Sequence, residues 1–394
     1  MDLPALRFQT VARRRILIAA KGRAGMGKSI ARGEMTDFPD IVAATASYEA
    51  WLGKQVDLVK SDLKLKHARM ADDQFQFFRA TFYRWMQLWP RLCPELDAAP
   101  RLVAVGDLHI ENFGTWRDAE GRLIWGVNDY DEAHPLPYTQ DLVRLAASAL
   151  LAARTGGLSI DPELICAAIL KGYGKGLSAG GRPFVLGADF VWLREIAIAD
   201  LRDPTRFAAR MAALAKPRYR VPKKVEKALA QQMPEAGLDI IHRHRVAGLG
   251  SLGRRRVVAL ADWRGGIVVR EAKPMIPSAC VWAQGRPQDA EVFYRAVTDR
   301  PDRCPDPWLT VQDGWVIRRL AADSSAIEMA RLPRGAERRL LTAMGRETAN
   351  VHQTGDCKAV RADLKARPKH WLQDAAHRML KALEADWVAW RERD

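Results

Sequence analysis

The chain has 394 residues, of which 48% are hydrophobic and 28% are charged. These proportions exclude disordered, collagen-like and coiled-coil chains, and the length predicts two or three domains or one large bilobal fold. Lysine and arginine number 62 against 47 acidic residues, and this excess of 15 positive charges predicts an anionic partner such as a nucleotide, a nucleic acid, a phosphorylated substrate or a membrane surface.

The cysteines and the N-terminal segment indicate the compartment. The five cysteines are odd in number and form no CxxC pair, which predicts a reducing environment without disulfides or a structural zinc site. The apolar run at 16–20 is too short for a secretory signal, and no window reaches ~18 uninterrupted apolar residues. We therefore expect a cytoplasmic protein with no membrane partner.

A helical pattern extends from about 50 to 92 and carries an aromatic stripe. Its members, three or four residues apart, are Phe75, Phe78, Phe82, Trp85 and Trp89. This spacing places them on one helix face. A buried core face is favoured over a surface on which a ligand stacks.

Two short strands and further helices are expected next. Leu102–Val105 and Leu123–Val127 are apolar runs predicted to pair, with a turn at Asp118–Gly121. Thr139–Arg154 has the spacing of an amphipathic helix. More helix is expected to about residue 235, interrupted by the glycine-rich stretch Gly172–Gly181.

The pattern changes to short strands separated by glycine-rich loops at about residue 240. Strands are expected at 240–246, 256–261, 267–272 and 315–320, with a hairpin turn at 262–266 and helices at 287–297 and from about 334. The predicted domains are a basic N-terminal arm (1–50), a mainly helical lobe (51–239), a β-rich lobe (240–330) and C-terminal helices (331–394).

Polar side chains directly follow the first two predicted strands. Asp107 and Asn112 follow one strand, and Asp129 and Asp131 follow the other. Such positions lie at the lip of a cleft, and their oxygens suit Mg²⁺ bound to a polyphosphate. The protein-kinase catalytic loop has the same Asp-Leu-x-x-x-Asn spacing before a metal-binding aspartate. The pattern predicts Asp107 as the catalytic base and Asn112, Asp129 and Asp131 as metal ligands; turn and cap residues are the structural alternative.

A glycine-rich hairpin, GLGSLG, lies between two predicted strands. Its residues Gly248, Gly250, Ser251 and Gly253 match a GxGxxG motif. A dinucleotide-binding fold would need a helix after this motif, whereas a strand follows here. A strand–GxGxxG–strand arrangement is typical of kinases, in which the loop covers the nucleotide phosphates.

The strand after this hairpin is expected to supply a cation to the phosphates. It offers Arg270 and Lys273, whose odd spacing places them on opposite faces of a continuous strand. Only one of them can therefore point into the cleft. Glu291, on the following predicted helix, is a candidate partner for that cation.

At these residues the chain resembles known families. GDLHIENFG, NDYDEAHPLPYTQDLVRLAAS and a later GxGSxG before VVREA resemble the bacterial domain-of-unknown-function family 2252 over residues 55–356. The first two elements also resemble the HGDLHxxN and IDFxxA motifs of aminoglycoside phosphotransferases. That resemblance implies a kinase-like fold with ATP and Mg²⁺ as cofactors, Asp107 as base, Asn112 and Asp129 as metal ligands, and Asp141 as a structural aspartate.

The order of the motifs differs from that in kinases. The glycine-rich hairpin follows the catalytic loop by about 140 residues, whereas kinases place it before that loop. The resemblance therefore implies an α+β, circularly permuted bilobal fold with the helical catalytic lobe first and the β lobe later. Arg270 also stands where kinases use lysine, and the two side chains are not equivalent.

Three other patterns compete with this interpretation. Gly22–Ser29 matches GxxxxGK[ST], in which Lys28 and Ser29 would bind phosphate and Mg²⁺, but turn signals from Gly33 leave barely two helical turns. Asp107-x-His109 is also typical of dinuclear metallophosphoesterases, whose other motifs are missing. Basic segments at 1–35, 216–227 and 243–256 could form a nucleic-acid surface.

The sequence thus predicts an ATP- and magnesium-dependent phosphotransferase that acts on an unknown small-molecule or protein acceptor. One alternative is a catalytically silent kinase-like scaffold that binds nucleotide or nucleic acid through its basic surface. A P-loop NTPase built on residues 22–29 is the third.

Overall fold

The computed structural model describes residues 39–187, 189–199, 203–285, 291–300, 303–324, 332–333 and 335–393, and the side chains of 198 and 199 are outside this description. The motif at Gly22–Ser29 and most of the expected basic arm lie outside the described residues. Helices and three antiparallel sheets make up the described part of the chain, which confirms the predicted α+β class. Among the described residues, no helix has the length and apolar character needed to cross a membrane.

The aromatic stripe packs in the core, as predicted, although Phe75 is only partly buried. It spans two helices rather than one, because the helical run breaks at Thr81, whose hydroxyl donates a hydrogen bond to the Phe77 carbonyl oxygen. Phe78, Phe82, Trp85 and Trp89 are all nearly inaccessible to solvent. The N-terminal helices are α1 (Ile41–Gln55), α2 (Lys60–Asp72), α3 (Gln74–Ala80), α4 (Phe82–Leu92) and α5 (Pro94–Asp97).

The pairing predicted between the first two strands is wrong. Strand β3 (Leu123–Val127) pairs with β2 (Phe113–Arg117), a strand that the sequence analysis missed, and with β5 (Phe184–Val185). Strand β1 (Arg101–Ala104) pairs instead with β4 (His134–Pro137). The turn at 118–121 closes the β2–β3 hairpin, since the Asp118 carboxylate accepts hydrogen bonds from backbone N–H groups inside it.

The glycine-rich stretch does not interrupt its helix. Helix α7 (Pro162–Ala179) continues through Gly172 and Gly176 and ends at Gly180, which has a φ of 71°. A Cβ atom on Gly172 would overlap the carbonyl oxygen of Thr342 in α13 (Ala336–Val351), so glycine is required for the close approach of the two helices. The other helices described between residues 138 and 231 are α6 (Tyr138–Arg154), α8 (Val191–Ala199), α9 (Pro204–Ala212) and α10 (Lys223–Gln231).

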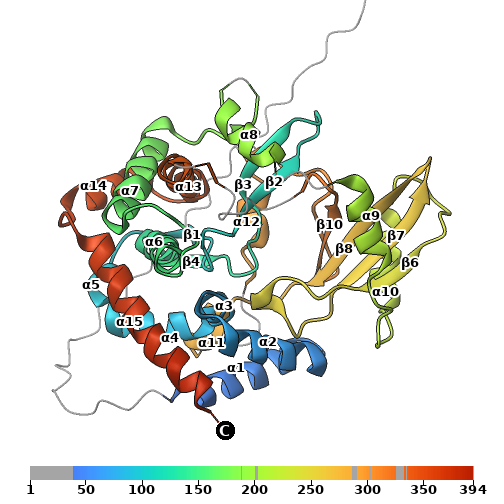
Figure 1. Cartoon of the computed structure of the whole chain (residues 1–394), viewed down its shortest axis with the longest axis horizontal. Helices are drawn as coiled ribbons and strands as arrows, with labels where there is room; N and C mark the ends of the chain where they lie inside the picture. Colours follow the sequence, from blue (N-terminus) through green and yellow to red (C-terminus); the bar gives the residue numbers. More distant parts are fainter. Residues whose placement is uncertain are drawn as a thin grey trace, which may run out of the picture. The chain divides into compact units, whose positions relative to one another are not determined.

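A five-stranded antiparallel sheet forms the β-rich part of the chain (Figure 1). Its strand order is β6–β7–β8–β10–β9. The predicted hairpin turn is present, with Arg264 and Gly265 both at positive φ, as a two-residue turn that follows the strand twist requires. The strands are β6 (Ile241–His244), β7 (Val257–Trp263), β8 (Gly266–Pro274), β9 (Thr310–Gln312) and β10 (Trp315–Leu320).

Helices cover the sheet unequally on its two faces. Val225 and Leu229 of α10 pack with Val257 and Ile317 on one face. On the opposite face α9 supplies a smaller cluster, which covers only part of the sheet. The expected helix at 287–297 is represented by α12 (Tyr294–Thr298), preceded by α11 (Ala279–Ala283), while 286–290 lie outside the described residues.

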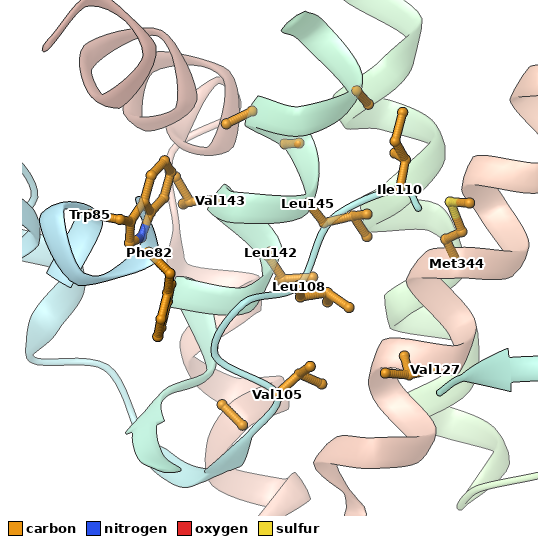
Figure 2. Packing of buried hydrophobic residues seen from close by; sticks show 14 of the residues in the cluster. Phe82, Trp85, Val105, Leu108, Ile110, Val127, Leu142, Val143, Leu145 and Met344 are labelled. Carbon is orange, nitrogen blue, oxygen red and sulfur yellow. The ribbon is translucent and has the colours of Figure 1, made fainter. Parts of the chain in front are cut away.

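The C-terminal helices complete the main core. Helices α13, α14 (Cys357–Ala366) and α15 (Trp371–Arg391) contribute to the same buried cluster as α4 and α6. Figure 2 shows part of this cluster around the loop that follows β1, where Leu108 lies beside Leu142 of α6. Leu108 and Ile110, which alternate with the polar residues of this loop, thus anchor it in the core.

Candidate active site

A cleft of about 210 Å³ lies where the two predicted polar loops meet the glycine-rich hairpin. Residues about 140 positions apart in the chain thereby share one cavity. The loops supply Asp107, His109, Glu111, Asn112, Asn128, Asp129, Asp131 and Glu132; the hairpin supplies Gly248, Leu249, Gly250 and Ser251; and Arg79, Arg254 and Arg318 complete the wall.

The backbone ahead of Asp107 is fixed by a buried aspartate. Asp141, in the first turn of α6, accepts hydrogen bonds from the N–H groups of Val105 at 2.8 Å and Gly106 at 2.9 Å. His352 contacts the same carboxylate at 2.9 Å. These contacts agree with the structural role that the resemblance implied for Asp141.

Arg144 orients the carboxylate of Asp107. Its Nε and Nη2 atoms lie 2.7 and 2.5 Å from Asp107 Oδ1. The guanidinium is fully buried, with its centre 4.2 to 5.0 Å from the rings of Phe78, Phe82 and Trp85. The aromatic stripe therefore encloses the cation that holds the candidate base.

Burial shifts the pKa values of two side chains in this loop. Burial raises the pKa of Asp107 above its usual value, although the Arg144 and Arg79 guanidinium groups oppose the increase. The pKa of His109 is well below its usual value because of burial and the same two cations. Its Nδ1 accepts a hydrogen bond from the Glu111 N–H, so the neutral ring braces the loop internally.

Asn112 joins the two polar loops. Its Nδ2 donates to the carbonyl oxygens of Asp107 at 3.2 Å and Asp129 at 3.1 Å, and its Oδ1 accepts from the Asp129 N–H at 3.1 Å. Asn112, which was predicted as a metal ligand, therefore holds the two loops together through its hydrogen bonds. One lone pair of Oδ1 remains for a cation.

Lys273, and not Arg270, points toward the aspartates of the second polar loop. Lys273 Nζ lies 2.6 Å from Asp131 Oδ1 and 3.1 Å from Asp129 Oδ1. Arg270 points to the opposite face of β8, where its Nε donates to the Gln232 carbonyl oxygen at 2.8 Å. The prediction of Arg270 as a phosphate ligand is therefore wrong, because the alternation of a continuous strand turns it toward α10.

Glu291 is not the partner of that lysine. It is exposed and precedes α12, while the ammonium of Lys273 forms its ion pairs with Asp129 and Asp131. The prediction that Glu291 pairs with the lysine is therefore wrong, because the second polar loop already provides two carboxylates to Lys273. An ion pair with an exposed glutamate would add little.

A buried glutamate with three arginines lies beside Lys273 on the same face of the sheet. Glu271 is completely buried, and its Oε1 accepts from Arg245 at 2.5 Å. Its Oε2 accepts from Arg256 and from Arg318, each at 2.8 Å. Burial alone would raise the pKa of Glu271, but the three guanidinium groups hold it well below its usual range. The sequence analysis missed this cluster.

The glycine-rich hairpin is docked on helix α2 and shaped by glycine. Gly253 has a φ of 98°, and its carbonyl oxygen accepts a hydrogen bond from the Val59 N–H at 2.7 Å. A Cβ atom there would overlap Leu63, so Gly253 lies against the helix and not among the cleft residues. The expectation that it covers phosphates is wrong, whereas Gly248, Gly250 and Ser251 line the cleft.

A buried lysine supports the hairpin from below. Lys66 Nζ lies 3.4 Å from the Gly250 carbonyl oxygen, and burial lowers the pKa of Lys66 to about 8, although Glu49 raises it. The unfolded chain binds this proton up to the ordinary pKa of 10.5. Unfolding therefore takes up a proton between pH 8 and 10.5, and the free energy of unfolding rises with pH in that window.

Replacing Lys66 by methionine is expected to stabilise the protein at pH 7 by up to about 3 kcal/mol, because the variant buries no ammonium. The advantage should shrink as the pH rises from 8 to 10.5 and be absent above it. Urea denaturation of both proteins across this range measures the difference, with Lys64→Met at an exposed position of α2 as control. A constant difference at all pH values would contradict the shifted pKa.

The residues fit a magnesium ion held partly by a ligand. Among the described residues, no group of three His, Cys, Asp or Glu side chains forms a protein-only metal site. Mg²⁺ commonly uses only one or two carboxylates together with phosphates and water. The Asp129 side chain is 43% exposed; burial favours its neutral form, but Lys273 and Arg318 hold its pKa well below the usual value, so it is ionised at neutral pH.

A known protein family matches the part of the chain that carries the two polar loops. Residues 58–186 match the model of a family described as "Uncharacterized protein conserved in bacteria (DUF2252)". This match supports the resemblance to the bacterial domain-of-unknown-function family over these residues, which include Asp107, Asn112 and Asp129, whereas the glycine-rich hairpin lies beyond it. Neither a curated protein nor a solved structure matches the chain.

Proposed function

We propose that the protein is an ATP- and magnesium-dependent phosphotransferase of the kinase-like type, acting on a small-molecule or protein acceptor. One observation carries the proposal. Lys273, on the sheet that bears the glycine-rich hairpin, forms ion pairs with Asp129 and Asp131, and both of these aspartates line the cleft together with Asp107. Kinases use a lysine, a metal-binding aspartate and a catalytic aspartate of this kind to bind and transfer a phosphoryl group.

The sheet supports a permuted kinase-like arrangement. In kinases the glycine-rich loop covers the phosphates and the lysine lies on the third strand. Here the hairpin connects β6 to β7, the first two strands of the sheet, and Lys273 lies on β8, the third. A permutation would move this sheet to a later position in the chain, while the glycine-rich loop and the lysine would keep their places relative to the strands.

The side chains divide the chemistry between them. Asp107 would accept the proton of the acceptor hydroxyl while Arg144 keeps its carboxylate in position. Asp129 and Asn112 would hold Mg²⁺, which supplies charge neutralisation to the phosphates. Lys273 and the backbone of Gly248–Ser251 would bind the phosphate oxygens. The acceptor oxygen forms a bond to the γ-phosphorus as the bond from that phosphorus to the ADP oxygen breaks.

Thermal-shift measurements with ATP, in the presence and absence of Mg²⁺, test the proposal. We expect an ATP-induced increase in the melting temperature that requires Mg²⁺ and disappears in Asp129→Ala, because this carboxylate links metal and phosphate. Lys28→Ala should keep the full shift, as should Asp262→Ala at an exposed position of the β7–β8 hairpin. Loss of the shift in Lys28→Ala alone would favour the P-loop instead.

The arginines of 243–256 give little support to a nucleic-acid surface. Arg254 and Arg256 are buried and pair with acidic side chains inside the protein, and Arg245 pairs with Glu271. These charges are used within the fold and are not free for a phosphate backbone. Mg-ATP binding without turnover would point to the catalytically silent scaffold.

A further inference from the structure

A second cavity, of about 180 Å³, adjoins the candidate active site. The two cavities share Asn128 and Arg318 in their walls. We call it the Arg303 pocket. Its apolar side is formed by Trp116, Tyr130, Val127, Leu309 and Leu320, and none of these belongs to the predicted catalytic set.

The pocket contains a buried guanidinium with a free donor. Arg303 is 7% exposed, and its Nη2 donates to the Val127 carbonyl oxygen at 2.8 Å. Nη1 has no hydrogen-bond partner among the described residues, while Nη2 forms a long ion pair with Glu347 at 4.0 Å. An unsatisfied N–H on a buried cation is costly, so this position favours an anionic acceptor.

Aromatic rings fix the plane of this guanidinium. Its central carbon lies 4.6 Å from the centre of the Tyr130 ring and 5.6 Å from that of Trp116. The Trp116 indole is itself held, because its Nε1 donates to the Cys304 carbonyl oxygen at 2.9 Å. A rigid, stacked guanidinium is suited to bind a carboxylate with two parallel hydrogen bonds.

The remaining charges of the pocket also favour an anion. Arg245, Arg318 and Arg319 line it, partly neutralised by Glu271 and Asp323. Asp306 is the carboxylate among the lining residues. Burial raises the pKa of Asp306 above its usual value, although the nearby arginines oppose the increase, and its Oδ1 accepts a hydrogen bond from the Trp308 N–H at 2.9 Å.

The volume and the walls limit the ligand to a single ring. Pockets for drug-sized ligands occupy ~300–1,000 Å³, so a cavity of about 180 Å³ accommodates a smaller molecule. Two aromatic walls favour a flat apolar body. A neutral nucleobase would fit the walls but would leave the Arg303 donor without an anion.

We propose that the Arg303 pocket binds a small carboxylate carried on a flat ring, with the carboxylate on Arg303 and the ring against Trp116 and Tyr130. Binding of this organic acid does not depend on the proposed phosphotransferase activity. The shared wall at Asn128 would also place this ligand beside the phosphates, so it could serve as a co-substrate, and that role rests on the proposed phosphotransferase activity.

Calorimetric titration of the full-length protein with benzoate and with benzamide, without nucleotide, tests the proposal. The two probes share ring and size and differ in charge. We expect benzoate to bind in the millimolar range or tighter, and at least tenfold more tightly than benzamide, because only benzoate satisfies the buried guanidinium. Asp129→Ala should bind benzoate as the wild type does, which separates this site from the phosphate site.

Variants of the arginines assign the binding to this pocket. Arg303→Met should weaken benzoate binding at least tenfold, and Arg303→Lys, which keeps the charge but loses the fork, should weaken it less. If Arg303→Met does not fold, Arg303→Lys and Arg319→Gln at the partly exposed rim retain the test, and both should weaken binding. Equal affinity for the two probes, unchanged affinity in these variants, or competition between benzoate and Mg-ATP would overturn the proposal.

Discussion

Replacing Asp107 by asparagine is expected to lower ATP turnover by about two to four orders of magnitude while Mg-ATP still binds. Asparagine has nearly the shape of aspartate, so the loop fixed by Asp141 should keep its conformation. The amide, however, cannot accept the proton of the acceptor hydroxyl. ADP formation in a coupled assay measures turnover, and the thermal shift with Mg-ATP measures binding.

Two further variants separate proton transfer from loop structure. Arg144→Lys should lower kcat with little change in KM and move the acidic limb of the pH–rate profile, because Arg144 opposes the effect of burial on the pKa of Asp107. Asp262→Asn, at an exposed position, should leave both kcat and the pH–rate profile unchanged. Undiminished turnover in Asp107→Asn would reject this residue as the base.

The sequence was sufficient to locate the two polar loops. Asp107, Asn112 and Asp129 follow short apolar strands, and side chains just beyond a strand reach the solvent-filled edge of a fold. Strand alternation also showed that only one of Arg270 and Lys273 could enter the cleft. The choice between them depended on which face of β8 is covered by α10, and this is a property of packing between distant segments.

The residues that the sequence analysis missed are defined by such packing. Arg144 lies three residues after Asp141, one helical turn away, which was a usable signal that both side chains support the same loop. Glu271 offered no comparable signal, since its three arginines come from three different strands or loops. Local patterns cannot show which charges converge.

The glycines of α7 show how packing overrides a local preference. Glycine in a helix interior costs roughly 1 kcal/mol relative to alanine, so Gly172–Gly181 predicted an interruption. The helix continues because Gly172 and Gly176 allow α13 to approach closely, and the close packing of the two helices outweighs that cost. A similar argument applies to the hairpin, whose Leu249 and Leu252 belong to the main core although they lie far from it in sequence.

Replacing Glu271 by glutamine is expected to destabilise the protein by about 3–5 kcal/mol at pH 7, the second large effect that the structure predicts. The substitution removes the negative charge and leaves three guanidinium groups close together in a buried site. Because the pKa of Glu271 is depressed in the folded protein, its stabilising contribution is complete above the pKa of the unfolded chain and is lost as the pH falls. Urea denaturation at pH 7 measures the loss.

The charge repulsion left by Glu271→Gln can be tested by removing one of the arginines. Arg245→Gln in the Glu271→Gln background should recover part of the lost stability, since it leaves two guanidinium groups instead of three. Glu291→Gln makes the same change at an exposed glutamate and should alter the free energy of unfolding by less than about 0.5 kcal/mol. If Glu271→Gln lowered the free energy of unfolding as little as Glu291→Gln, the negative charge of Glu271 would not be what stabilises the three buried arginines.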